Sequence, residues 1–284
     1  MLNAGIILPN TLAEALRVLR GGGRALAGGT DLLISARRGG APAPWVDISR
    51  LPQLRGIRRQ DGHIFIGAAE KITDVGAHPL TREMLPALAQ ACRKFACPSL
   101  RNMATLGGNC ANGSPAADGL CALCAENAAA IIANDGGIRK IPVESLVLGP
   151  KKTALSRCDI ILGFELPDTA HKGVYLKLAA RRSFAISKVS AGVTLRLENG
   201  LARGVSIMLG AAGPRPLRAA KSQEILEGAP LSADMIERAA LAARDACSPV
   251  DDARSSAEYR RAMAAVLARR ALSIIANDAA KESL

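Results

Sequence analysis

The chain has 284 residues, of which 49% are hydrophobic and only 2% aromatic, and its formal net charge is +12. A chain of this length can bury a large core and is expected to form two domains. The core must be packed mainly by aliphatic side chains, and the scarcity of aromatic residues argues against the stacking platforms that bind single-stranded nucleic acid.

The positive charge is scattered along the chain in basic pairs, such as Arg58-Arg59, Lys151-Lys152 and Arg269-Arg270. No long basic tract and no recognised nucleic-acid-binding motif accompanies them. A solvated surface and a docking face for an acidic subunit explain such pairs equally well. We therefore expect no nucleic-acid partner. A basic adaptor or nucleic-acid-binding protein is kept as an alternative hypothesis for the function of the chain.

The seven cysteines are odd in number and have no framework spacing. Reduced thiols are therefore favoured over disulfides, and with no signal-peptide pattern and no long apolar run we expect a cytoplasmic protein without a membrane span. Cys121 and Cys124 lie three residues apart on an expected helix. A metal site would need four ligands, so burial as small apolar side chains is the default reading of this pair.

The first half of the chain reads as two subdomains, about 1–53 and 54–170. Residues 11–19 are expected to form a helix because Thr11 and Glu14 make a capping box. Short strands are expected at 24–27 and 45–48 around a glycine turn. A hairpin turning at Asp61-Gly62 opens the second subdomain, and a strand within 155–167 ends it.

The second half, 171–284, is expected to form a separate domain. Alternating patterns at 173–179, 186–197 and 201–210, with Asn199-Gly200 as a turn, predict a three-stranded antiparallel sheet. Three amphipathic helices within 219–276 are expected to cover one face of it. The predicted fold class is therefore α+β.

Two glycine turns are the strongest functional signal. The first glycine turn, residues 25–32, contains Gly28-Gly29; the second glycine turn, residues 104–118, contains Gly107-Gly108 followed by Ser114-Pro115, which reads as a helix cap and first helical residue. Glycines let a backbone approach a ligand, and free N–H groups at a helix start suit a phosphate. Neither turn fits the single-fingerprint dinucleotide motif or the P-loop. The pair predicts one clamped diphosphate, with ordinary structural turns as the alternative.

The pair AGGTDLL and ATLGGNCANGSPAAD resembles the FAD-binding medium subunit of molybdenum hydroxylases, such as xanthine, carbon monoxide and nicotinate dehydrogenases. The resemblance implies a two-subdomain PCMH-type FAD-binding domain followed by the C-terminal domain, and an FAD-dependent oxidoreductase subunit. It also implies a large molybdopterin-binding partner and a small [2Fe–2S] partner, assembled as a dimer of heterotrimers. Electrons would pass from the clusters through FAD to NAD⁺, a quinone or oxygen, and no catalytic side chain or metal ligand is expected here.

The resemblance also implies which residues hold FAD. Phe95 would stack on the flavin, the backbone at Ile160 and Ile161 would reach the isoalloxazine, and Lys177 would lie near its N1–C2=O edge; a core aromatic and a surface lysine are the alternatives for Phe95 and Lys177. The turns would contribute Ala25, Ala27, Gly28, Gly29, Thr30, Asp31, Leu32, Ala104, Thr105, Gly107, Gly108, Asn109, Ala111, Ser114 and Asp118.

Two points stay open at the level of sequence. Phe184 stands near a position that is acidic in xanthine-oxidising relatives, which leaves the electron acceptor undecided. The second hypothesis is a self-sufficient flavoenzyme of the same fold, which would need its own substrate domain and proton donor; neither is recognisable.

Overall fold

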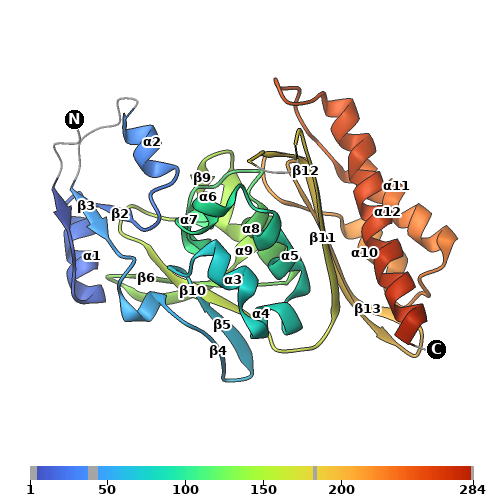
Figure 1. Ribbon diagram of the computed structural model, residues 1–284, viewed down its shortest axis with the longest axis horizontal. Coiled ribbons are helices and arrows are strands. Elements are labelled where there is room, and N and C mark those ends of the chain that lie inside the picture. The colour runs from blue at the N-terminus through green and yellow to red at the C-terminus, as the bar shows by residue number, and fades with distance from the viewer. Residues whose placement is uncertain (1–4, 38–43, 182–183, 283–284) are drawn as a thin grey trace.

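A computed structural model describes residues 5–37, 44–181 and 184–282. Figure 1 shows three parts in a row: a small N-terminal part, a central sheet with helices on it, and a C-terminal sheet with helices on its outer side. The expected α+β class is confirmed.

The N-terminal part is a three-stranded parallel sheet in the order β1-β3-β2. Its elements are β1 (Ile6–Ile7), α1 (Leu12–Arg20), β2 (Arg24–Leu26), α2 (Leu32–Arg37) and β3 (Trp45–Asp47). The Thr11 hydroxyl accepts a hydrogen bond from Glu14 N, as the capping box requires, but the Glu14 carboxylate accepts from Asn10 N, one residue before the cap.

The central part is a five-stranded antiparallel sheet in the order β4-β5-β10-β6-β7. Its strands are β4 (Ile57–Gln60), β5 (His63–Gly67), β6 (Ala129–Asn134), β7 (Gly137–Pro142) and β10 (Ile160–Pro167), with a small pair β8 (Val147–Gly149) and β9 (Lys152–Thr153). Its helices are η1 (Pro52–Leu54), α3 (Ile72–Ala77), α4 (Pro79–Met84), α5 (Pro86–Lys94), α6 (Pro98–Arg101), α7 (Leu106–Ala111), α8 (Asp118–Ala125) and α9 (Val143–Leu146). The hairpin predicted at Asp61-Gly62 is confirmed, since both residues have positive φ and join β4 to β5.

The C-terminal sheet contains the three expected strands and one more. The strands are β11 (Lys172–Ala179), β12 (Ser187–Glu198), β13 (Leu201–Gly210) and β14 (Leu217–Arg218). The fourth strand escaped prediction because it is two residues long and follows two prolines, so it has no alternating pattern. The expectation of three strands is corrected to four.

The C-terminal sheet is packed on both faces. Its outer face meets α10 (Ala220–Leu226), α11 (Ala233–Ala246) and α12 (Ala257–Glu282), where Val193 and Leu272 share a buried cluster. Its inner face meets α5 and α8 so closely that a Cβ at Gly192 would lie 2.9 Å from Ala125 Cβ. The sheet thus carries residues of the C-terminal half to the start of α8 (Figure 1).

No helix in the described part of the chain combines the length and apolar character needed to cross a bilayer.

Candidate functional site

The two glycine turns are in direct contact although about 75 residues separate them. A Cβ at Gly28 would lie 2.3 Å from the Met103 carbonyl oxygen and 3.0 Å from Ala104 Cα. Only a residue without a side chain allows the first turn to approach the second this closely. The two turns therefore lie side by side and can contact the same ligand.

The first glycine turn offers a run of free N–H groups. Within the described residues, the N–H groups of 28–32 donate no hydrogen bond, whereas Leu33 N begins the bonding of α2 by donating to Gly29 O at 3.1 Å. Gly29 has a φ of +68°, which turns the backbone sharply and favours glycine. Successive N–H groups in such a turn make a concave anion-binding site.

The second glycine turn is built differently. Gly107 N donates to Ala68 O at 2.8 Å, and Gly108 N donates to the Thr105 hydroxyl, which caps α7, at 3.1 Å. The expectation of free N–H groups is therefore wrong at both glycines. Within the described residues Thr105 N donates no hydrogen bond, and the start of α7 still carries the partial positive charge of a helix N-terminus.

The helix expected to begin at Ser114-Pro115 begins later. Helix α8 starts at Asp118, and Ser114 instead closes a turn, with its carbonyl accepting from Ala117 N and its hydroxyl from Ala116 N. The serine hydroxyl satisfies a donor within its own turn, so it does not cap a helix. The glycines themselves occupy the first turn of a helix, α7.

The two adjacent glycines of the second turn face different surroundings. A Cβ at Gly107 would lie 2.6 Å from Ala68 Cβ in the core, whereas a Cβ at Gly108 would meet only the Thr105 hydroxyl, at 2.8 Å. Gly108 is exposed. Gly107 is thus needed for packing, and Gly108 presents bare backbone to the surface.

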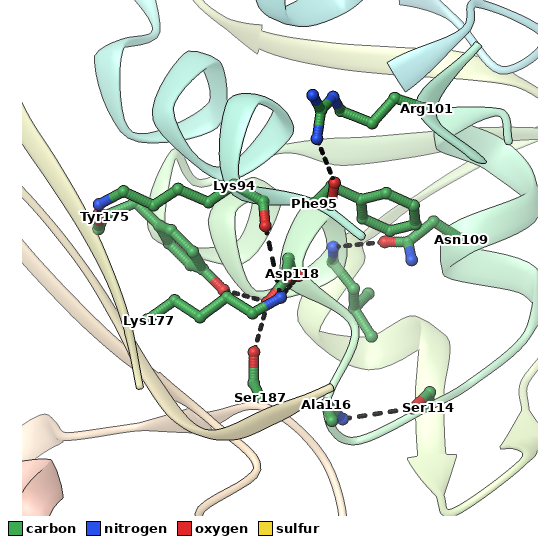
Figure 2. A network of polar contacts seen from close by, with 11 residues as sticks. Lys94, Phe95, Arg101, Asn109, Ser114, Ala116, Asp118, Tyr175, Lys177 and Ser187 are labelled. Atoms are coloured by element: carbon green, nitrogen blue, oxygen red, sulfur yellow. Dashed lines mark hydrogen bonds and ion pairs between the residues drawn. The ribbon is translucent and has the colours of Figure 1, made fainter. Parts of the chain in front are cut away.

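Asp118 is the centre of a buried polar network, shown in Figure 2. Its Oδ1 accepts hydrogen bonds from Tyr175 OH at 2.8 Å and Ser187 Oγ at 2.6 Å, and its Oδ2 accepts from Lys177 Nζ at 2.6 Å. Burial, and then the Asp118 charge, raise the pKa of Tyr175 well above its usual value, so the phenol stays a donor. Lys177, the lysine that the resemblance places near the flavin, forms an ion pair with the Asp118 carboxylate.

Phe95 lies beside this network, at the end of α5. Its ring is half-buried, and its carbonyl accepts from Arg101 Nη1 at 2.7 Å. Lys94 Nζ donates to Tyr175 O at 2.7 Å, and burial, followed by the charge of Arg93, lowers the pKa of Lys94. The end of α5 is thus fixed against β11, near Lys177.

The other residues implied by the resemblance fall into three groups. Asn109 uses its side-chain oxygen to accept from Leu120 N at 3.1 Å, which ties α7 to α8. Ile160 and Ile161 are 1% and 6% exposed, and both pack in the hydrophobic core. The remaining positions line the turns: Ala25, Ala27, Thr30 and Leu32 are half-buried, Ala104 is buried, and Asp31 and Ala111 are exposed.

Sequence reasoning missed Lys151, which lies between β8 and β9. Its Nζ is 3.0 Å from Asp31 Oδ2 and 2.5 Å from Asn112 Oδ1, so it connects the first glycine turn to the end of α7. The sequence gives no signal for this role, because Lys151-Lys152 reads as one more basic surface pair and its partner Asp31 is 120 positions away.

Two basic hollows lie near the end of α5, which contributes Arg93 to one and Lys94 to the other. One, of about 870 Å³, includes Arg82, Arg93 and Arg101 in its lining. The other, of about 410 Å³, lies between β11 and α12 and includes Lys177 and Arg270. Part of the net positive charge is thus gathered around these two hollows.

The cysteine pair of α8 is buried in the central core. Burial, the largest influence, raises the pKa of Cys121 to about 12 and that of Cys124 well above its usual value. Both thiols are therefore neutral at ordinary pH. Over residues 5–37, 44–181 and 184–282, no cluster of three or more His, Cys, Asp or Glu side chains is placed to hold a metal ion.

Comparison with known proteins identifies the class to which this architecture belongs. Residues 2–169 match the FAD binding domain in molybdopterin dehydrogenase, and residues 174–275 match the CO dehydrogenase flavoprotein C-terminal domain. The chain belongs to the family of FAD-binding medium subunits of molybdenum hydroxylases. It binds FAD and is an FAD-dependent oxidoreductase subunit.

The sequence similarity to individual relatives extends over nearly the whole chain. The xanthine dehydrogenase FAD-binding subunit of Escherichia coli O157:H7 is 31% identical over 270 residues, covering 93% of this chain and 92% of that protein. The carbon monoxide dehydrogenase medium chain of Hydrogenophaga pseudoflava is 30% identical over 269 residues, covering 93% and 94%.

Solved structures give the same result. Carbon monoxide dehydrogenase from Hydrogenophaga pseudoflava, in a form lacking the Mo-pyranopterin moiety, superposes with a TM-score of 0.91 at 30% identity, covering 95% of this chain and 96% of that one. Quinoline 2-oxidoreductase from Pseudomonas putida 86 superposes with a TM-score of 0.90 at 25% identity, covering 97% and 98%.

Proposed function

We propose that the FAD diphosphate lies between the two glycine turns and that the isoalloxazine extends toward Phe95, the Ile160–Ile161 backbone and Lys177. The observation that carries this proposal is the contact of Gly28 with Met103 and Ala104 beside the free N–H groups of the first turn. An unbonded run of N–H groups suits a diphosphate, and the proposal is supported by the packing of β10 and α8 against α7 and by the bond of Lys177 to Asp118 at the start of α8.

The bound flavin supplies the electron-transfer chemistry, and this chain's residues bind and orient it. The first glycine turn binds by backbone N–H groups, and the start of α7 adds the positive end of its dipole. Lys177 is fixed by Asp118, so it acts as a positioned donor whose charge is partly balanced. No side chain of this chain is assigned a proton-transfer step.

We also propose the place of this chain in a larger assembly. Electrons would arrive from [2Fe–2S] clusters of a small partner, after substrate oxidation on a large molybdopterin-binding partner, and would leave to NAD⁺, a quinone or oxygen. The proposal rests on relatives described as medium chains or FAD-subunits of dehydrogenases. The proposed assembly is a dimer of heterotrimers in the cytoplasm. Within it, this chain has one domain at 1–170 and a second at 171–284.

The match of residues 174–275 to a flavoprotein C-terminal domain favours the subunit role over a self-sufficient flavoenzyme. The experiment is expression of the chain alone and together with its partner chains. We expect a flavin absorbance band at about 450 nm in both preparations, and co-purification of iron and molybdenum only in the second. A chain without flavin would contradict the cofactor site, and turnover of a substrate by the flavin-loaded chain alone would contradict the subunit role.

The terminal acceptor is tested separately on the reconstituted complex. Reduction of the flavin through the partner subunits would be followed by mixing with NAD⁺ or an artificial quinone, and the rate of flavin reoxidation compared. Reoxidation by neither compound, with rapid reoxidation in oxygen, would assign the oxygen route.

A further inference from the structure

Lys151 is fixed in place at its backbone. It has a φ of +59°, in the left-handed region that non-glycine residues seldom adopt, and its N–H donates to Gly113 O at 2.8 Å. Gly113 itself packs closely here, since a Cβ on it would lie 3.4 Å from Lys151 Cα. The tight turn between β8 and β9 is thus anchored to the segment joining α7 and α8.

The Lys151 side chain spans the two sides of the cofactor site. Its ammonium donates to Asp31 Oδ2, in the first glycine turn, and to Asn112 Oδ1, at the end of α7. An ammonium has three N–H donors. Within the described residues two of them are used, which leaves one available for an anionic ligand between the turns.

The charge of Asp31 explains why a cation is useful at this point. The Asp31 carboxylate lies within the run of free N–H groups at 28–32, so it would repel a diphosphate bound there. Among the described residues, Lys151 is the cation that pairs with Asp31. The two side chains are 57% and 56% exposed, so their pairing stabilises the fold only slightly.

We propose that Lys151 is a clasp for the cofactor diphosphate: it holds Asp31 against the α7 side of the site, balances its charge and donates to a phosphate oxygen. This inference rests on the FAD site proposed above. It assigns to Lys151 the role of a positioning and binding residue, for a ligand of the nucleotide-diphosphate class.

The test compares FAD release from the full chain by recovery of free-flavin fluorescence after dilution. Lys151→Gln should release FAD about fivefold faster than the wild type, a factor that corresponds to one exposed ion pair. Lys152→Gln is the matched control, because it removes the same charge from the next residue, which is exposed and forms no ion pair with the described residues. Lys151→Arg should restore most of the retention, since arginine can reach both partners.

A double variant separates charge balance from a purely structural role. If Lys151 balances Asp31, adding Asp31→Asn to Lys151→Gln should slow FAD release again, because the unpaired carboxylate is gone. Thermal unfolding of the flavin-free single variants should match that of the wild type.

Equal release rates for Lys151→Gln, Lys152→Gln and the wild type would overturn the clasp while leaving the FAD site intact. A double variant that releases FAD as fast as Lys151→Gln would overturn the charge-balancing role. A wild-type chain that retains no FAD would instead contradict the proposed site, and the clasp with it.

Discussion

The two glycine turns use the same dipeptide for different purposes. Gly28-Gly29 leaves its N–H groups free and lets one loop touch another, whereas Gly107-Gly108 lies in the first turn of α7 with both N–H groups bonded to the protein. The first turn is joined to the β8–β9 turn by the exposed ion pair between Asp31 and Lys151. The second turn ends at Asp118, which forms a buried ion pair with Lys177. Adjacent glycines therefore do not by themselves define an anion site; the bonding of their N–H groups does.

The largest expected effect tests the buried side of this comparison. Asp118→Ala should lower the free energy of unfolding by about 3–5 kcal/mol, because Lys177 would be left buried and unpaired and the Tyr175 and Ser187 hydroxyls would lose their acceptor. Urea unfolding of the flavin-free chain measures it. Asp31→Ala, at the exposed first turn, is the control and should cost less than about 1 kcal/mol. Similar costs for the two would remove the contrast between the turns.

The next effect separates the two glycines of the second turn. Gly107→Val should destabilise the chain by about 1–3 kcal/mol, since its side chain would overlap Ala68 in the core. The shift in the thermal unfolding midpoint of the flavin-free protein measures this. An unchanged midpoint would mean that Gly107 and Ala68 are not packed as described.

Gly108→Val should reduce flavin retention and change stability little. Its side chain meets only the Thr105 cap and otherwise projects where we propose the diphosphate, so the expected cost to folding is about 1 kcal/mol. The ratio of flavin to protein absorbance after gel filtration gives the occupancy. Full occupancy in this variant would refute the role of the second turn in cofactor binding.

The smallest expected effect is a pH dependence of the free energy of unfolding, caused by the pair of His171 and Glu126 at the end of α8. The buried Glu126 carboxylate accepts from Ala87 N and Leu88 N at the start of α5 and lies 2.6 Å from His171 Nε2. Burial alone would lower the pKa of His171, but the hydrogen bond and charge of Glu126 outweigh it and raise that pKa. Because the folded pKa exceeds the unfolded one, the stabilisation is complete below about pH 6.5 and is lost as the pH rises through the folded value.

This dependence is measured by urea unfolding at a series of pH values, with His171→Gln as the control. The wild type should lose stability relative to the variant as the pH rises from about 6 to about 8, which is the range in which histidine side chains lose their charge. Parallel curves for the two proteins would show that the pair does not contribute.

Local chemistry made several elements predictable. Thr11 caps α1, and Asp61-Gly62 and Asn199-Gly200 adopt the positive φ values that tight hairpins require, so the sequence located these elements correctly. The fourth strand, β14, was missed because two residues carry no periodic pattern and become a strand only by pairing with β13.

The sequence by itself determined the α+β composition, the places of both glycine turns and, through them, the family. Those features depend on residue preferences over a few neighbouring positions. Tertiary structure decided what each turn does: the residues that follow β5 supply acceptors for Leu106 and Gly107, β11 brings Lys177 to Asp118, and the β8–β9 turn brings Lys151 to Asp31. Each of these contacts joins residues more than 35 positions apart, and a hydrogen bond between such residues has no local sequence pattern because the fold, not the spacing, brings them together.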